Sequence, residues 1–384
     1  MRRIGLAERR ARLGVRHLLA KRKASTVVDA TEAVVALHST DPATVFLSLW
    51  ARTRKVGPGD VEQALYEDRS LLRLHGIRRT MFVISTAFAP VFRAASTRAM
   101  AEQQRKRYVQ LFEQNGVGDA RRFRELGEAA LAALAKRGEA TGVQLSADVP
   151  DLRTPIIVQG YQQNLTTWVL FQLAADVRII RGRPRGSWIS SQYTWSPAEA
   201  WLPDGLAELP VADARTELVR RWLAAFGPGT VADLRWWTGW TAAHIKAALT
   251  AIEPVEVDLD GEVGLVLPDD EAPVRAPASW VALLPALDPT PMGWSGSRSW
   301  YVGEHAKALF DRSGNIGPTV WCDGRVVGGW AQRADGEVVF RLLEDIGTSA
   351  TAAVTKEAAR LREWIGPVRV TPRFRTPLEK ELVS

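Results

Sequence analysis

Apolar residues recur at the spacing of amphipathic helices through most of the chain up to Pro268, and three times such helices precede two strand-like segments. The strand pairs fall at residues 71–84, 177–191 and 254–267. The last pair contains Asp260-Gly261, a dipeptide that favours a two-residue hairpin turn. Helices followed by a strand hairpin are typical of a winged helix. The pattern therefore predicts three winged-helix modules in series.

Residues that favour the first turn of a helix locate several of the helices. Asp41 followed by Pro42 predicts a helix over 43–52, because aspartate caps a helix and proline fits its first position. Thr230 is expected to cap a helix over 231–237, and Thr241 is expected to cap the next one.

Beyond Pro268 the period changes from helical to alternating. Asp323-Gly324 and Asp335-Gly336 are turn signals between three strand-like segments, which predicts an antiparallel meander. One helix over 349–364 and a final strand over 368–374 are expected to follow. This part of the chain is predicted to be a β-rich domain with one helix, built as a partial barrel.

These patterns together predict an α+β protein of four domains, and 384 residues exceed the length of one typical domain. We expect the first winged helix with a trailing helix at 1–118, the second at 119–210 and the third at 211–270. The β-rich C-terminal domain is expected at 271–384.

Composition limits the classes of protein that the chain can represent. Its 50 basic and 43 acidic residues give a formal charge of +7, a mild excess that favours a polyanionic partner. The single cysteine, Cys322, excludes a disulfide framework, a four-cysteine iron–sulfur cluster and a cysteine zinc site. No segment has the apolar length of a membrane span, and the basic N-terminus lacks the apolar core of a secretory signal. We expect a cytoplasmic monomer.

Arginines gather in the first two strand pairs. The second pair carries three of them around two glycines, whereas the third pair is acidic and is expected to pack against another element. We predict that the basic pairs contact DNA phosphates, although hairpin arginines are also commonly just solvated. The predicted DNA-binding residues are Arg78, Arg79, Arg181, Arg183 and Arg185. Trp236, Trp237 and Trp240 can stack on bases, but such a cluster is more often core between modules.

Several enzyme signatures are missing from the sequence. It has no G-x-x-x-x-G-K-[ST] phosphate loop, no paired metal-ligating histidines on a helix and no G-x-S-x-G nucleophile turn. A polar string remains at Leu37–Pro42, between two apolar helices of the first predicted module. This concentration of polar groups at one junction makes it the candidate site.

At this string the chain resembles the AlkZ and YcaQ type of winged-helix DNA glycosylases, in which a first-module helix ends in Gln-x-Gln or Gln-x-Asp, commonly followed by Asp. His38 and Thr40 stand at the two motif positions here, and Asp41 follows. The resemblance continues at 65–82, at Leu287-Asp-Pro-Thr-Pro-Met-Gly-Trp and at Gly328-Gly-Trp, so it covers nearly the whole chain.

The resemblance implies three tandem winged helices and a β-rich domain arranged around a DNA channel. It also implies hydrolysis of the N-glycosidic bond of alkylated purines, including bulky adducts and interstrand crosslinks, with no metal and no cofactor. The expected partner is double-stranded DNA that carries alkylated purines, and the expected location is the nucleoid.

Both family glutamines are replaced in this sequence. A purine alkylated at N7 or N3 is already cationic, so the enzyme must mainly stabilise an oxocarbenium-like sugar and direct a water molecule to it. We predict that Asp41 supplies negative charge, that His38 orients or deprotonates the water, and that Thr40 positions it. Asp41 as a simple helix cap and His38 as a buried histidine bonded to a carbonyl are the structural alternatives.

Two other functions stay open at this stage. The chain can be a non-catalytic DNA-binding protein, a regulator or an architectural factor, in which His-x-Thr has replaced the active motif. It can also be an interaction scaffold that binds no DNA.

Overall fold

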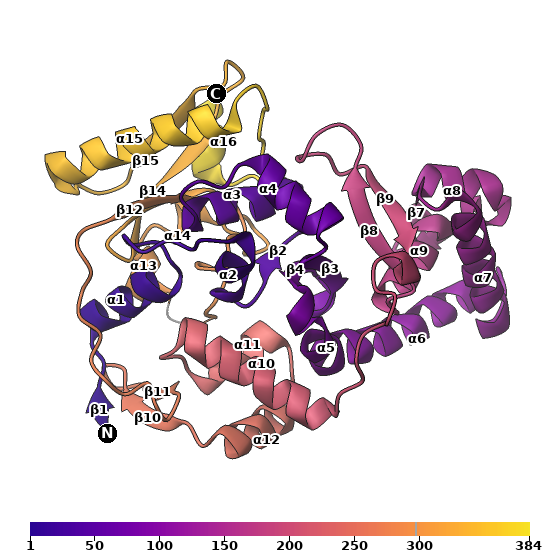
Figure 1. The fold of residues 1–384 in the computed structure, drawn as a ribbon, viewed down its shortest axis with the longest axis horizontal. Coiled ribbons are helices and arrows are strands. Elements are labelled where there is room, and N and C mark those ends of the chain that lie inside the picture. The colour runs from indigo at the N-terminus through magenta and orange to yellow at the C-terminus, as the bar shows by residue number, and fades with distance from the viewer. Residues whose placement is uncertain (296–297) are drawn as a thin grey trace.

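The computed structural model describes residues 1–295 and 298–384, and its strands lie in five small sheets with helices between them (Figure 1). The predicted α+β class is confirmed. The N-terminal part contains helices α1 (Leu6–Arg16), α2 (Val27–Glu32), α3 (Pro42–Arg52), α4 (Pro58–Glu62), α5 (Ala89–Phe92) and α6 (Arg98–Gln114). Its sheet has the order β2 (Leu37–His38), β4 (Met81–Ser85), β3 (Leu71–His75).

Helix α3 begins where the sequence predicts. The carboxylate of Asp41 accepts a hydrogen bond from the backbone N–H of Ala43 at 3.1 Å, and Pro42 occupies the first turn. All eleven residues of α3 are buried, so the helix runs through the interior of the molecule.

The second part of the chain contains the predicted arginine hairpin and further elements that the sequence pattern did not reveal. Its elements are α7 (Ala120–Arg137), β5 (Ala140–Thr141), α8 (Gly142–Asp148), β6 (Pro155–Val158), β7 (Tyr161–Asn164), α9 (Leu165–Ala175), β8 (Ile179–Pro184) and β9 (Tyr193–Pro197). The hairpin β8–β9 is confirmed, whereas the hairpin β6–β7 and helix α9 were missed. Helix α9 is apolar nearly all round, so it has no helical period to detect.

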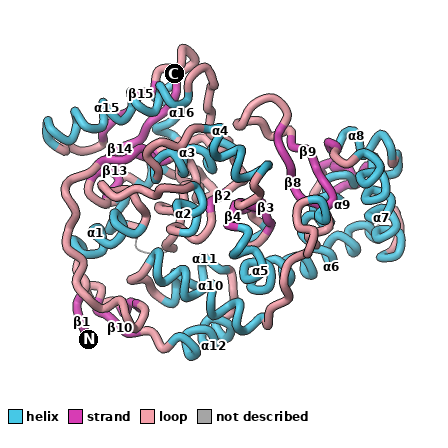
Figure 2. Tube along the Cα trace, viewed as in Figure 1, coloured by secondary structure: helices cyan, strands magenta, loops and turns pink. Residues whose placement is uncertain are grey.

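The loop between β8 and β9 reaches across to the N-terminal and C-terminal parts (Figure 2). Trp188 in this loop is buried, and its ring lies 5.0 Å from that of Phe46 on α3 and 5.8 Å from that of Trp364. The hairpin tip is therefore anchored by aromatic packing and does not project freely into solvent.

The third part agrees closely with its prediction. It contains α10 (Val211–Phe226), α11 (Val231–Thr238), α12 (Ala242–Ile252), β10 (Val255–Asp258) and β11 (Val263–Val266). The hydroxyls of Thr230 and Thr241 cap α11 and α12, as expected. The acidic hairpin packs against the N-terminal strand β1 (Arg2–Arg3), where Arg3 pairs with Asp260 at 2.6 Å.

The C-terminal part has a four-stranded antiparallel sheet of β12 (Val281–Leu284), β13 (Thr319–Cys322), β14 (Arg325–Gln332) and β15 (Val338–Leu342). Its helices are α13 (Ser299–Val302), α14 (Ala306–Leu309), α15 (Gly347–Ile365) and α16 (Pro377–Val383). The meander and the long helix are confirmed, and the barrel stays a prediction.

The final strand expected over 368–374 is wrong. In this segment the backbone N–H of Val370 donates to the side chain of Gln332 at 2.8 Å, and that of Arg373 donates to Asp41 at 2.9 Å. Side-chain oxygens thus take these donors in place of the carbonyls of a neighbouring strand.

The main hydrophobic core crosses the expected domain boundaries. Its buried residues come from α1–α5, the β8–β9 region, α10–α12 and the C-terminal sheet with α15, while a second core fills the space around α7 and α9. The four-domain division remains a prediction. In the two described segments, no helix is both long and apolar enough to cross a membrane.

A buried ion pair connects the N-terminal and C-terminal parts. Arg52 at the end of α3 binds both oxygens of Asp288 at 2.8 and 2.7 Å, and both side chains are fully buried. Ser48 donates to the same carboxylate at 2.6 Å, and Arg52 also donates to the hydroxyl of Thr290 at 2.7 Å. This set of four residues is called the Arg52–Asp288 clamp below.

The clamp continues to His17, at the end of α1. The Thr290 hydroxyl lies 2.9 Å from Nδ1 of His17, and Nε2 lies 3.1 Å from the carbonyl of Ala225 on α10. Since that hydroxyl accepts from Arg52, it can donate to Nδ1, which leaves the proton of His17 on Nε2 for Ala225. Burial lowers the pKa of His17 to about 3, which agrees with a neutral ring.

Removal of one charge from the clamp is expected to be far more costly than removal of both. Asp288→Ala leaves Arg52 buried and unpaired and should lower the free energy of unfolding by about 3–5 kcal/mol, against about 1 kcal/mol for Ser48→Ala. The double variant Arg52→Met, Asp288→Leu should be more stable than Asp288→Ala. Urea unfolding of the four proteins measures this, and equal losses for Asp288→Ala and Ser48→Ala would contradict it.

The protein is expected to lose stability as the pH falls below about 6.5. Burial lowers the pKa of His17 and His75 to about 3 and that of His38 to about 4, so below pH 6.5 the unfolded chain binds more protons than the folded one. Each histidine should contribute up to about 1.4 kcal/mol per pH unit. Urea unfolding at pH 7.5 and 5.0 should show a smaller pH dependence for His17→Gln, and an unchanged dependence would argue against this origin.

Candidate active site and nucleic-acid interface

The polar string singled out in the sequence forms a corner between β2 and α3, called the 38–41 corner here. Strand β2 ends at His38, the backbone N–H of Ser39 donates to the carbonyl of Met81 at 2.9 Å, and Asp41 caps α3. His38, Thr40 and Asp41 are therefore held together by their neighbours in the chain, beside β4 and below the segment that carries Arg373.

His38 is half-buried and neutral at pH 7. Burial lowers its pKa to about 4, and the positive charge of Arg78 acts in the same direction. Its Nδ1 lies 3.4 Å from the backbone N–H of Thr40, a long contact that nevertheless places the ring proton on Nε2. Within the described residues Nε2 makes no hydrogen bond, so it is free to donate to a bound molecule.

Thr40 and Asp41 differ in whether their side chains are already hydrogen-bonded within the protein. The carbonyl of Thr40 accepts from the guanidinium of Arg373 at 3.3 Å, and its hydroxyl makes no hydrogen bond to any described residue. Asp41 is only 6% exposed, and its two oxygens accept from the backbone N–H groups of Ala43 and Arg373 at 3.1 and 2.9 Å. Burial raises its pKa, while these two donors oppose the rise.

The side chain of Asp41 is enclosed by the protein and has almost no space beside it. It lines a cavity of about 10 Å³ together with Trp330 and Gln332 of β14, a space that holds one water molecule at most. The carboxylate thus faces the C-terminal sheet, and its contacts favour the structural reading of this residue as a helix cap.

The β2–β4–β3 sheet separates two groups of side chains. His38, Phe82 and Leu74 are cross-strand neighbours on one face, and the rings of His38 and Phe82 are 5.7 Å apart. The next residues in the strands, Arg73 and Leu37, lie on the opposite face. The 38–41 corner therefore borders both faces.

On the His38 face, Arg78 is the nearest cation. Its guanidinium lies 4.4 Å from the ring centre of Trp236 on α11, and that of Arg298 lies 5.1 Å from the same ring. Arg78 and Arg79 are exposed and adopt left-handed φ values of 53° and 64°, a strained conformation that is often found at functional sites. Trp237, in contrast, is buried in the core.

On the other face, Arg73 is buried and fixed by Ser39 and Tyr66, at 3.2 and 2.8 Å. Arg181 on β8 shares the ring of Tyr193 with it, at 4.7 Å for Arg181 and 5.2 Å for Arg73. Burial lowers the pKa of Arg181 to about 10, and the charges of Arg73 and Arg373 add to this effect. The corner is thus surrounded by arginines on both sides.

The five arginines predicted to bind DNA have different environments. Arg78, Arg79 and Arg185 are exposed, whereas Arg183 forms ion pairs of 2.8 Å with both Glu62 and Glu67. Arg183 therefore ties β8 to α4, and its charge is largely neutralised within the protein. DNA contact by these residues stays a prediction.

The structure adds three arginines that the sequence interpretation missed. Arg298 and Arg373 come from the C-terminal part and reach the site only through the fold. Arg73 did carry a local signal, since it is a charged residue in the otherwise apolar run Leu-Leu-Arg-Leu. In residues 1–295 and 298–384, no three His, Cys, Asp or Glu side chains are grouped as metal ligands.

Comparisons with known proteins agree with this architecture. Residues 31–364 match the family described as DNA glycosylase AlkZ-like. The chain is 30% identical over 172 residues to the interstrand DNA cross-link repair glycosylase of Streptomyces sahachiroi, a match that covers 42% of this chain and 46% of that protein. The sequence match thus spans about half the length of this curated relative.

The fold is also similar to the solved structure of the Streptomyces sahachiroi DNA glycosylase AlkZ. The TM-score is 0.74 at 22% identity, and the match covers 97% of this chain and 99% of that one. The similarity extends over the whole arrangement of helices and small sheets. At 22% identity it shows that the two chains share a fold. Because the family match covers most of the sequence, the resemblance is confirmed, and the chain belongs to the AlkZ-like family of DNA glycosylases.

Proposed function

We propose that this protein is a DNA glycosylase that hydrolyses the N-glycosidic bond of alkylated purines, with the attacking water held by His38 and Thr40. The observation that carries the proposal is the neutral, half-buried imidazole of His38, whose Nε2 has no hydrogen bond to a described residue. An imidazole with a pKa of about 4 is a weak base but a good hydrogen-bond donor.

In the proposed reaction, Nε2–H of His38 donates to the oxygen of the water and the hydroxyl of Thr40 accepts one of its hydrogens. The water then adds to C1′ of the deoxyribose as the bond to the purine breaks, and the proton that the water loses passes along the hydrogen bond to the Thr40 hydroxyl, whose own proton goes to solvent. An alkylated purine is cationic before the reaction and leaves as a neutral base, so no acid is needed on the leaving group. His38 and Thr40 would thus make the hydrogen bonds expected from the two glutamine side chains of the family motif.

Asp41 is assigned a positioning role. Its carboxylate caps α3 and holds the backbone of Arg373, which in turn places a guanidinium beside Thr40. Direct stabilisation of the sugar cation by Asp41, as predicted from the sequence, requires the carboxylate to leave these two donors.

We further infer that the three three-stranded sheets and their helices are three winged helices that border a DNA channel with the C-terminal domain. Arg78 and Arg298 near His38, and Arg373 beside Thr40, are the arginines that we expect to bind phosphates near the target sugar. The name of the curated relative, an interstrand cross-link repair glycosylase, supports bulky or crosslinked purines as the substrate class.

Loss of the His38 side chain is expected to lower the rate of base release about 100-fold, because the attacking water loses the group that positions it. Asp41→Asn should lower it less than tenfold and reduce the free energy of unfolding by about 1 kcal/mol, because Asn can still cap α3 but has no second oxygen to accept from the backbone N–H of Arg373. The measurement is single-turnover release of 7-methylguanine from methylated DNA by wild type, His38→Ala and Asp41→Asn.

A fall of 100-fold with Asp41→Asn and none with His38→Ala would reverse these roles. No release from methylated, bulky-adduct or crosslinked DNA by the wild type, alongside tight binding, would identify a non-catalytic DNA-binding protein.

DNA binding is expected to depend on salt through the arginines near the corner. Arg78→Gln should reduce the slope of log affinity against log salt by about 0.9, the value for one phosphate contact. Arg121→Gln on α7, at the outer edge of the molecule, is the matched control and should leave the slope unchanged (Figure 1). Fluorescence anisotropy with a short duplex between 50 and 200 mM salt measures both, and equal slopes for Arg78→Gln and wild type would remove Arg78 from the interface.

A further inference from the structure

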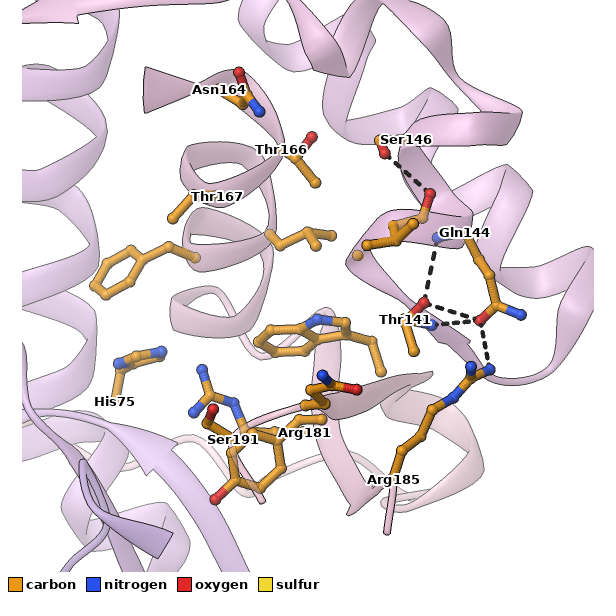
Figure 3. Close-up of a pocket in the computed structure, with 17 residues that line it drawn as sticks. His75, Thr141, Gln144, Ser146, Asn164, Thr166, Thr167, Arg181, Arg185 and Ser191 are labelled. Carbon is orange, nitrogen blue, oxygen red and sulfur yellow. Dashed lines mark hydrogen bonds between the residues drawn. The ribbon is translucent and has the colours of Figure 1, made fainter. Parts of the chain in front are cut away.

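A large pocket lies beside the 38–41 corner, between α9 and the hairpin β8–β9, and the corner does not form any of its wall. Its volume is about 700 Å³, and Figure 3 shows His75 and Arg181 on one side of it and Thr141, Gln144 and Arg185 on another. The first turn of α9 completes the wall with Thr166 and Thr167. We call this space the α9 pocket.

Three side chains of the α9 pocket have polar atoms without partners among the described residues. Both ring nitrogens of His75, the hydroxyl of Tyr193 and Nε of Arg181 are buried and make no hydrogen bond to the part of the chain that the structure describes. His75 is only 6% exposed and Tyr193 only 9%. Unsatisfied buried polar groups are costly, so the clustering of four such atoms around one cavity favours a polar ligand there, together with the charges described next.

The charges of the α9 pocket favour an anion. Arg181 and Arg185 line it, and no Asp or Glu of the described chain does. Arg181 lies 4.7 and 5.1 Å from the ring centres of Tyr193 and Trp195 and has no acidic partner among the described residues. The 11-residue helix α9 also begins here, and Asn164 before it makes no cap hydrogen bond, so the positive end of the helix is not occupied by a side chain.

The apolar part of the same wall is aromatic. Phe171 and Trp195 line the pocket with Tyr193, and the amide side chains of Gln144, Asn164 and Gln192 are distributed around them. Aromatic faces bind the planar rings of nucleobases, and amides bind their edges. An anion site beside aromatic rings and amides matches one nucleotide, a base together with its phosphate.

We propose that the α9 pocket binds a single unstacked nucleotide, with its phosphate at Arg181 and the first turn of α9 and its base against the aromatic wall. The pocket adjoins the corner through Arg73, which contacts both Tyr193 and Ser39. A DNA strand that reaches the corner can therefore place a displaced nucleotide in the pocket. The inference that the bound nucleotide belongs to a DNA strand rests on the proposed function. The inference that the pocket binds a nucleotide does not, because a free nucleotide carries the same base and phosphate.

The test introduces a negative charge where the phosphate is expected. Thr167 is exposed in the first turn of α9, so Thr167→Glu should fold normally, since an acidic residue suits this end of a helix. Thr348→Glu is the matched control, because Thr348 is an exposed threonine in the first turn of α15. Arg181→Gln removes the cation itself.

Calorimetric titration with deoxycytidine monophosphate should show binding to the wild type and to Thr348→Glu, and at least tenfold weaker binding to Thr167→Glu and Arg181→Gln. Deoxycytidine without the phosphate should bind at least tenfold more weakly than the monophosphate. Anisotropy should show that wild type prefers a duplex with a one-nucleotide bulge to a fully paired duplex, and that Thr167→Glu loses this preference.

Absence of monophosphate binding at millimolar concentration, or equal affinities for the wild type and Thr167→Glu, would overturn the proposal. If the wild type binds the monophosphate but does not prefer the bulged duplex, the pocket is a nucleotide site, and the inference that its nucleotide comes from a DNA strand is overturned. None of these measurements uses base release. Nucleotide binding without base release would therefore reject only the proposed function, and base release with an unaffected Thr167→Glu variant would reject only the α9 pocket.

Discussion

The position of the 38–41 corner depends on the buried pair of Arg52 and Asp288. Both charges are fully removed from water, and such a pair persists only when its geometry and its additional hydrogen bonds are satisfied. Here Ser48 and Thr290 supply those bonds, so the end of α3 has one permitted position relative to the C-terminal segment. Because α3 is a rigid buried helix, its N-cap residue, Asp41, is fixed at the other end by the same constraint.

This constraint gives a structural meaning to one of the motifs that carried the family resemblance. Leu287-Asp-Pro-Thr-Pro-Met-Gly-Trp supplies Asp288 and Thr290 to the clamp, and its Trp294 donates to the carbonyl of Phe226 at 3.2 Å. The motif thus joins the N-terminal, third and C-terminal parts and does not itself contact the corner. A motif shared within a family of enzymes can act by placing the catalytic groups.

The electrostatics of the corner follow from burial. The carboxylate of Asp41 is held by backbone donors, and the nearest formal charges are Arg78 and Arg373. Such a site attracts phosphates and keeps His38 neutral, but it offers little negative charge of its own to a sugar cation. We infer that the DNA phosphates flanking the target sugar, once fixed by these arginines, provide most of that charge. In the proposed reaction, the protein would position the water and the DNA phosphates would supply the negative charge near the sugar.

Local signals in the sequence predicted the elements that depend on a few neighbouring residues. The caps at Asp41, Thr230 and Thr241 are examples, because a cap is a contact within three residues of the chain. Helix α9 was missed since it is apolar nearly all round, and the strand predicted over 368–374 is absent because distant side chains bind the backbone of this segment. The composition of the candidate corner could be read from the sequence, but its arginine surroundings could not, since Arg298 and Arg373 reach it only through the fold.

The docked tip of the β8–β9 hairpin shows how such distant contacts change a prediction. Three arginines around two glycines predicted a basic hairpin whose tip contacts DNA phosphates. In the structure Trp188 fixes the tip between α3 and α15, and Arg183 is paired with two glutamates of the first part. The remaining arginines are thereby separated, with Arg181 turned toward α9 and Arg185 on the surface. A free wing would leave Arg181 solvated. Anchoring the tip instead places this cation among aromatic rings, with no acidic partner in residues 1–295 and 298–384. The α9 pocket is a defined space because the hairpin that forms one of its walls is held in place.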